Sequence, residues 1–115
     1  MVNLSSHFFI NDQHPWQDLG GGVSRKIVGH TPELMCVVVR FAKGAAGTAH
    51  THDVHTQISY VAAGSFEVNV GGCKQVLGPA DGFIAPKHVL HGAVALEEGS
   101  MLVDMFSPRR DEFLE

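Results

Sequence analysis

Residues 65–73 read Ser-Phe-Glu-Val-Asn-Val-Gly-Gly-Cys, and this stretch carries the most regular β pattern in the chain. Phe66, Val68 and Val70 alternate with polar residues, and successive side chains of a strand point to opposite faces. The two glycines that follow permit the positive φ angles of a two-residue hairpin turn. The stretch therefore predicts a strand that reverses at the two glycines and returns through residues 74–77.

Short strands separated by turns rich in Gly and Pro are expected along most of the chain. Besides this hairpin, apolar and alternating runs predict strands at 23–28, 34–41, 57–62, 83–84, 91–96 and 101–106, with a turn at 29–32. Short strands at a spacing of roughly 8–12 residues are typical of an all-β sandwich or barrel.

The two ends of the chain lack this pattern. Residues 1–22 are expected to be irregular, with a short strand at 8–10 and a loop at 18–22, and residues 109–115 are expected to form a helical turn. A chain of 115 residues has the size of one domain. The prediction is a single domain over 1–115, with an N-terminal arm (1–22), a barrel (23–107) and a short C-terminal tail (108–115).

Charge and hydropathy exclude several classes of protein. The net charge is −4 with neutral histidines, and the 8 basic residues are scattered, so no basic stripe is present to bind nucleic acid. No apolar run approaches the length of a membrane span, and the N-terminus lacks the basic and apolar regions of a signal peptide. The 2 cysteines form no disulfide framework. We therefore expect a cytoplasmic protein that binds neither nucleic acid nor membrane.

Histidines are concentrated in residues 50–57, which read His-Thr-His-Asp-Val-His-Thr-Gln. In an extended chain His50 and His52 point to the same face, so they could offer two imidazole nitrogens to one metal ion. Gln57 lies at an odd spacing from His50 and needs a bend near Asp53-Val54 to reach that face. The spacing alone is equally compatible with a metal site and with a pair of solvated surface histidines.

A second histidine group follows at residues 86–92, which read Pro-Lys-His-Val-Leu-His-Gly. The spacing from Gly44 through the first histidine group to Gly64, together with the spacing from Pro86 to His91, resembles the two signature motifs of the cupin superfamily. This resemblance implies a small jelly-roll barrel, or double-stranded β-helix, whose inward-facing ligands hold one divalent metal ion. Matching the motifs position by position gives the metal ligands His50, His52, Gln57 and His91.

Two positions depart from the usual cupin pattern. Gln57 stands where most cupins carry glutamate, and His88 stands where the second motif usually has glycine. Imidazoles and an amide are all neutral ligands, so they leave the charge of the metal uncompensated and make it a stronger Lewis acid that attracts carboxylates. We therefore expect binding or isomerisation of an acidic substrate rather than oxygenase chemistry. The ligand set does not select among Zn, Ni, Fe, Co and Mn.

A closer resemblance covers nearly the whole chain. Residues 16–27, 50–72, 94–99 and 104–114 are similar to the pectin-degradation cupins of the KdgF family. This resemblance implies a metal-dependent enzyme that opens the ring of 4,5-unsaturated uronates from pectin or alginate and gives linear 5-keto-4-deoxyuronate. It also implies functional residues outside the metal ligands, at Asp104, Phe106 and Arg110.

The chemistry of these three residues suits such a reaction. Asp104 and Phe106 share one strand face, and Asp104 is expected to act as a general acid/base. Arg110 is expected to clamp the substrate carboxylate with its planar guanidinium, and Phe106 to pack against the sugar ring. The resemblance does not assign proton transfer to one of Asp104 and Arg110. Arg109, in contrast, is expected to be a solvated charge.

Two other functions remain compatible with the sequence: a non-catalytic cupin that binds a metal or a sugar, and, less readily, a cupin dioxygenase. His55 and His88 are expected to be solvated rather than to support the metal ligands. Tyr60 is expected on the outer face of its strand. Because cupins of this size commonly pair, a homodimer is expected.

Overall fold

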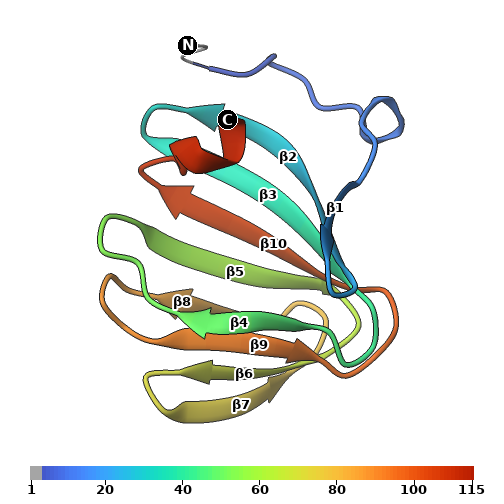
Figure 1. Cartoon of the computed structure of the whole chain (residues 1–115), viewed down its shortest axis with the longest axis vertical. Coiled ribbons are helices and arrows are strands. Elements are labelled where there is room, and N and C mark those ends of the chain that lie inside the picture. The colour runs from blue at the N-terminus through green and yellow to red at the C-terminus, as the bar shows by residue number, and fades with distance from the viewer. Residues whose placement is uncertain (1–3) are drawn as a thin grey trace.

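The computed structural model describes residues 4–115, which fold into two antiparallel β-sheets that face each other (Figure 1). The larger sheet has the strand order β1 (Gln17–Gly20), β2 (Val23–Thr31), β3 (Leu34–Phe41), β10 (Ser100–Ser107), β5 (Thr56–Ala63) and β8 (Gly82–Ala85). The smaller sheet has the order β4 (Ala46–His50), β9 (His91–Ala95), β6 (Phe66–Val70) and β7 (Cys73–Leu77). Two short 3-10 helices, Asn11–Gln13 and Asp111–Leu114, lie near the ends of the chain.

From β3 onward the chain passes back and forth between the two sheets. Among the described strands after β3, only the β6–β7 hairpin joins two consecutive strands of one sheet. Repeated crossing of this kind winds two sheets into a jelly-roll barrel. The predicted all-β jelly-roll class is therefore confirmed.

Inward-facing apolar side chains of both sheets fill most of the space between them. The main cluster consists of Phe41, Ala45, Val61, Phe66, Val68, Ala93, Ala95 and Leu102. Within it, the rings of Phe41 and Phe66 meet edge to face, with centroids 5.1 Å apart. A second cluster consists of Met35, Val37 and Phe106. Because such close packing holds the two sheets rigidly together, the polar residues that face inward are also held in place.

The alternating stretch that predicts the fold forms the β6–β7 hairpin. Phe66 and Val68 are buried in the main cluster, and Val70 pairs with Cys73 across the turn. The two glycines between them have φ angles of +59° and +87°, which places both central residues of the turn in the left-handed region. The predicted two-residue hairpin is therefore confirmed.

The prediction is wrong on the N-terminal side of the barrel. Gln17–Gly20 forms β1 and pairs with β2, whereas composition suggested a loop. Three glycines in a row suggested a loop, but only the last two of them form the turn between β1 and β2. Asp18 supports this turn by accepting a hydrogen bond from the Gly20 amide (2.8 Å). The larger sheet thus begins at Gln17 rather than at Val23. Residues 8–10 form no strand, since no described strand pairs with them.

One smaller difference concerns the end of β2. β2 continues to Thr31 instead of turning at 29–32, because a register shift between Ile27 and Gly29 keeps it paired with β3. The 3-10 helix Asp111–Leu114 confirms the predicted helical turn.

Both cysteines are free. Within residues 4–115, no helix is long and apolar enough to cross a membrane.

Candidate metal centre

Three strands and the loop between β4 and β5, which carries His52, bring the candidate ligands to one end of the barrel. His50 ends β4 and pairs directly with His91, the first residue of β9. Gln57 lies at the start of β5. Between β4 and β5 the chain bends at Asp53-Val54, as the odd spacing of Gln57 requires. The bend turns Gln57 toward the same interior that the two strand-end histidines face.

The four predicted ligands lie close together in the structure. The ligand nitrogens of His50, His52 and His91 are all within 4.8 Å of one another. The Oε1 atom of Gln57 lies 2.9 Å from Nε2 of His52 and 3.2 Å from Nε2 of His91. His52, His91 and Gln57 are buried, whereas His50 is exposed. The cluster therefore opens to solvent on the side of His50.

Backbone carbonyls orient two of the imidazoles for metal binding. Nδ1 of His50 lies 2.7 Å from the carbonyl oxygen of Thr48, and Nδ1 of His91 lies 3.1 Å from that of Val89. A carbonyl only accepts hydrogen bonds, so Nδ1 carries the proton in both rings and Nε2 keeps its lone pair. Metal-binding histidines are usually oriented by such a second hydrogen bond.

Burial keeps the two inner histidines in the form that binds metal. It is the main cause that lowers the pKa of His52 and that of His91, and a nearby charge on His50 or Arg110 lowers both further. Neutral imidazole is the form that coordinates a metal ion. The residues present therefore fit a divalent ion by geometry and by protonation state.

His88 lies outside the cluster, and its backbone explains the glycine that cupins usually have at this position. The residue is exposed, and its Nδ1 lies 3.4 Å from a carboxylate oxygen of Asp53. Its φ angle is +67°, a conformation that glycine adopts more readily than other residues. The His88 amide donates a hydrogen bond to the carbonyl of His52 (2.8 Å) and so joins the two histidine groups.

Asp104 lies directly across from Ser59 in the pairing of β10 with β5. Its Oδ1 accepts a hydrogen bond of 2.6 Å from the Ser59 hydroxyl. Burial raises the pKa of Asp104 to about 6, although the hydrogen bond from Ser59 and the charge of Arg110 partly offset that rise. A carboxyl group with such a pKa can exchange a proton near neutral pH.

A small cavity lies between Asp104 and the candidate ligands. Its volume is about 70 Å³, and His50, Gln57, His91 and Asp104 all line it. Since one water takes up about 30 Å³ in the liquid, the cavity is too small for a whole sugar. A substrate therefore has to approach through the open side, at His50.

Phe106 and Arg110 form a stack beside the cluster. The Phe106 side chain is only 2% exposed and meets His52 edge to face, with centroids 5.9 Å apart. The Arg110 guanidinium lies 5.1 Å from the Phe106 ring centroid and 4.3 Å from that of Phe113, and its Nε donates to Glu112 (3.2 Å). Phe106 thus supports His52 and Arg110, and its contact with a sugar ring stays a prediction.

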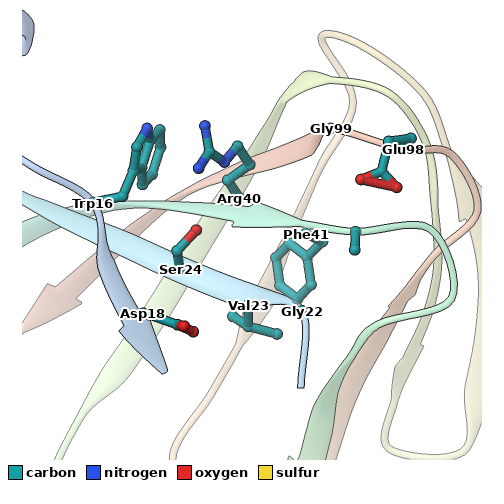
Figure 2. Close-up of a pocket in the computed structure, with 10 residues that line it drawn as sticks. Trp16, Asp18, Gly22, Val23, Ser24, Arg40, Phe41, Glu98 and Gly99 are labelled. Atoms are coloured by element: carbon teal, nitrogen blue, oxygen red, sulfur yellow. The ribbon is translucent and has the colours of Figure 1, made fainter. Parts of the chain in front are cut away.

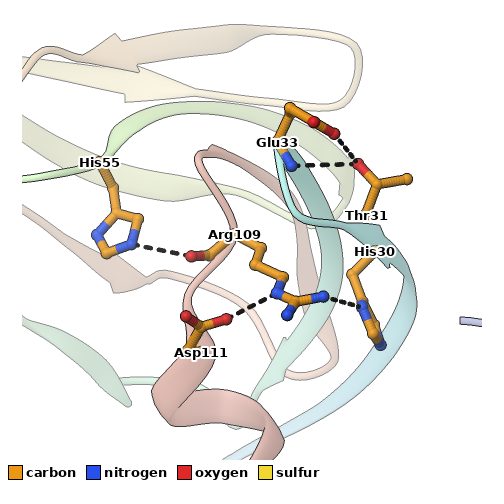
Figure 3. A network of polar contacts seen from close by, with 6 residues as sticks. All are labelled: His30, Thr31, Glu33, His55, Arg109 and Asp111. Carbon is orange, nitrogen blue, oxygen red and sulfur yellow. Dashed lines mark hydrogen bonds and ion pairs between the residues drawn. The ribbon is translucent and has the colours of Figure 1, made fainter. Parts of the chain in front are cut away.

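The expectation for Arg109 is wrong, because this arginine is buried (Figure 3). Its Nε donates to Asp111 (2.7 Å), and its Nη1 lies 3.4 Å from Nδ1 of His30. Its carbonyl accepts a hydrogen bond from Nε2 of His55 (3.2 Å), so His55 is also not simply solvated. These contacts tie the C-terminal tail to the barrel and so hold Arg110 above Phe106.

Ser59 is the polar residue of this region that sequence reasoning missed. Alternation along β5 places Gln57, Ser59 and Val61 on the inward face, and all three are buried. Besides its bond to Asp104, Ser59 accepts a hydrogen bond from Nε2 of Gln57 (2.9 Å). The sequence does contain a signal for Ser59, because it is a polar residue at an inward position two residues after a candidate ligand.

A larger surface pocket lies at the opposite end of the barrel (Figure 2). Its volume is about 550 Å³, and it shares only Phe41 with the cavity beside the histidines. The ring of Trp16 is covered by the guanidinium of Arg40 at 4.2 Å and by the ammonium of Lys26 at 4.8 Å. Two cationic side chains of the protein therefore already contact this ring, and the chemistry points to the histidine cluster instead.

A jelly-roll barrel with histidines and a glutamine gathered inside one end defines a cupin with a candidate metal centre. Residues 37–106 match the model of the family described as Cupin domain. The chain is also 55% identical over 107 residues to the pectin degradation protein KdgF of Dickeya dadantii, which covers 93% of this chain and 97% of that protein. The chain therefore belongs to the cupin family and, within it, to the KdgF family.

Solved structures agree with this assignment. The structure of KdgF from Halomonas sp. superposes with a TM-score of 0.92 at 55% identity, over 95% of this chain and 99% of that one. An RmlC-like cupin from Shewanella frigidimarina also reaches a TM-score of 0.92, at 46% identity, over 97% of this chain and 99% of that one.

Proposed function

We propose that the protein opens the ring of 4,5-unsaturated uronates released from pectin or alginate and forms linear 5-keto-4-deoxyuronate. The observation that carries the proposal is a His/Gln cluster beside a half-buried carboxyl group whose pKa is raised to about 6. Similarity to a protein named for pectin degradation supports the same substrate class.

The reaction is an isomerisation, so no oxidant or reductant is needed. A proton leaves the C1 hydroxyl, the bond between C1 and the ring oxygen breaks, and C1 becomes an aldehyde. The electron pair on the ring oxygen forms the C5 ketone while C4 takes up a proton. The enzyme therefore has to remove one proton, deliver another and stabilise negative charge on the ring oxygen.

Four side chains are proposed to hold one divalent ion: His50, His52, Gln57 and His91. Their geometry fits such an ion, and burial favours the neutral form of His52 and His91 by lowering the pKa of each. A bound ion would supply Lewis-acid polarisation of the substrate's carboxylate or ring oxygen. No anionic ligand cancels its charge in this set, which favours an acidic substrate.

Asp104 is proposed to carry the protons and Arg110 to hold the substrate carboxylate. The raised pKa of Asp104 suits a group that both takes up and releases a proton. An arginine keeps its charge and offers a planar fork that matches a carboxylate. Phe106 supports Arg110 from below and is proposed to contact the sugar ring once substrate is bound.

The first prediction is that metal-loaded protein accelerates the loss of the C4–C5 double-bond absorbance of unsaturated galacturonate. The matched control is buffer with the same concentration of the same metal ion, which measures any ring opening that occurs without the protein. The rate should be the same without oxygen, which separates this function from a dioxygenase. No acceleration over the control would refute the proposed function.

We further propose that the protein works in the cytoplasm as a homodimer. Large apolar side chains are exposed on the outer face of the larger sheet: Ile58 and Tyr60 on β5 are 49% and 46% exposed, and Ile84 on β8 is 53% exposed. Ile58 and Ile84 are direct cross-strand partners, so the three form one patch. An apolar patch on a sheet face favours pairing with a second copy of the chain.

The variant Tyr60→Glu is expected to convert this dimer into a monomer, because it places a charge in the middle of the patch. Sedimentation or light scattering measures the change. Val76→Glu is the matched control, since Val76 is equally apolar and exposed but lies on β7 of the other sheet. A monomeric unmodified protein, or a Tyr60→Glu variant that stays dimeric, would refute this interface.

A further inference from the structure

We propose that Ser59 is a positioning residue that holds the Gln57 amide with its oxygen toward the three histidines and its nitrogen toward Asp104. Ser59 would thereby join the metal centre to the proton-carrying group in one directed chain of hydrogen bonds. The placement of the amide stands on geometry alone, whereas the link to proton transfer rests on the proposed function.

The strand pairing brings the three residues of this chain of hydrogen bonds together. Gln57 and Ser59 lie two residues apart on β5 and so face the same side, and both are buried, with 6% and 1% exposure. Asp104 is the direct cross-strand partner of Ser59 on β10. The three polar side chains therefore meet on the inward face of the barrel, where polar groups are expected to be paired by hydrogen bonds.

The direction of each hydrogen bond follows from the chemistry of the groups. The Ser59 hydroxyl has a single proton, and it donates this proton to Oδ1 of Asp104 (2.6 Å). The Ser59 oxygen then accepts, and its neighbour at 2.9 Å on Gln57 has to be the amide nitrogen. The amide oxygen is consequently turned the other way, to within 2.9 Å of His52 and 3.2 Å of His91.

These hydrogen bonds give a second reason for a glutamine at position 57, in addition to the neutral charge of its side chain. A glutamate there would accept hydrogen bonds but donate none. That glutamate and Asp104 would then both depend on the one proton of Ser59, and two carboxylates would lie close together on the inward face of the barrel. Glutamine offers an oxygen to the metal and a donor to Ser59, so Gln57, Ser59 and Asp104 form a matched set.

The test measures the affinity of the protein for Co²⁺ alone, by competition with a chromogenic chelator, together with the visible absorption of bound Co²⁺. Ser59→Ala should weaken Co²⁺ binding by about ten-fold, the size of loss typical when a residue that orients a metal ligand is removed. The absorption bands should shift, because the Gln57 amide loses the Ser59 hydroxyl as the acceptor of its nitrogen. Ser59→Thr keeps the hydroxyl and should restore both the affinity and the spectrum.

Ser100→Ala is the matched control for the loss of a buried hydroxyl. Ser100 is 0% exposed, and its hydroxyl donates to the carbonyl of Glu97 (2.8 Å), far from the histidines. This variant should lose stability without any change in Co²⁺ affinity or spectrum. Equal loss of Co²⁺ affinity in Ser59→Ala and Ser100→Ala would reduce the role of Ser59 to general packing and overturn the inference.

A double-mutant cycle with Gln57→Glu sharpens the test. The two oxygens of a glutamate are equivalent, so no orientation remains for Ser59 to select. Ser59→Ala should therefore weaken Co²⁺ binding in the Gln57 background and change it much less in the Gln57→Glu background. Equal losses in both backgrounds, or no loss in either, would overturn the inference.

A measurement on the unmodified protein covers the case in which Ser59→Ala does not fold. In the Zn²⁺-loaded protein, nuclear Overhauser contacts from the Gln57 amide protons should reach the Ser59 Hβ protons and not the His91 ring; the reverse pattern would refute the inference. A protein that binds Co²⁺ as described but does not open the uronate would overturn the proposed function and leave the placement of the amide intact.

Discussion

The double variant His50→Ala/His52→Ala is expected to lose stoichiometric metal and, with it, all metal-dependent ring opening. The ligand nitrogens of the three histidines lie within 4.8 Å of one another, and the variant removes two of them. Only His91 and Gln57 then face the centre. Metal sites of this type need at least three protein ligands, so two neutral side chains should not retain the ion.

Elemental analysis after dialysis against metal-free buffer measures this loss directly. His88→Ala is the matched control, because this imidazole is exposed beside Asp53 and lies outside the cluster; it should keep one ion per chain. A chelator should remove both metal and activity from the unmodified protein, and a divalent ion should restore them. One ion per chain in the double variant would refute the ligand assignment.

The candidate ligands could be predicted because local patterns carry most of the information. His50 and His52 belong together by strand alternation, and the odd spacing of Gln57 required a bend that the structure has at Asp53-Val54. His91 could be added only through the resemblance to a family motif, since no spacing rule reaches across 34 residues from Gln57. In the structure, its partner across β4 and β9 is His50.

The surroundings of these ligands depend on contacts that are distant in sequence, so they could not be predicted. Arg109 and Arg110 are adjacent and look alike, yet Arg109 is buried beside His30 whereas Arg110 lies over Phe106. Ser59 likewise gains its meaning only from the register that places it opposite Asp104. Alternation predicts which face a side chain takes, but not which residue of another strand it will meet.

The variant Asp104→Asn is expected to lose turnover while it keeps its metal and its affinity for substrate. The amide has the shape of the carboxyl group, and its oxygen can still accept the hydrogen bond from Ser59, but it cannot carry a proton. Loss of a general acid/base lowers rates by about 10²–10⁴-fold, so kcat should fall within that range and KM should change little. Steady-state kinetics beside metal analysis provide the measurement.

Stability separates this loss of turnover from damage to the fold. Burial raises the pKa of Asp104 from 3.8 to about 6, so the folded metal-free protein disfavours the ionised carboxylate, and its stability falls as the pH rises from 3.8 to about 6 and stays reduced above. A neutral amide removes that cost. Above pH 6, metal-free Asp104→Asn should therefore unfold at the same temperature as the unmodified protein or at a higher one.

The same change at a distant carboxylate is the matched control. Asp18 is exposed and lines the pocket at the far end of the barrel, so Asp18→Asn should leave kcat, KM and metal content unchanged. We expect Asp104→Asn to be slow but stable and metal-loaded, and Asp18→Asn to be unaffected. Together these results would show that Asp104→Asn has lost proton transfer. If Asp104→Asn instead opens the uronate at the unmodified rate, the proton carrier has to be another group near the substrate, and Arg110 becomes the residue to replace next.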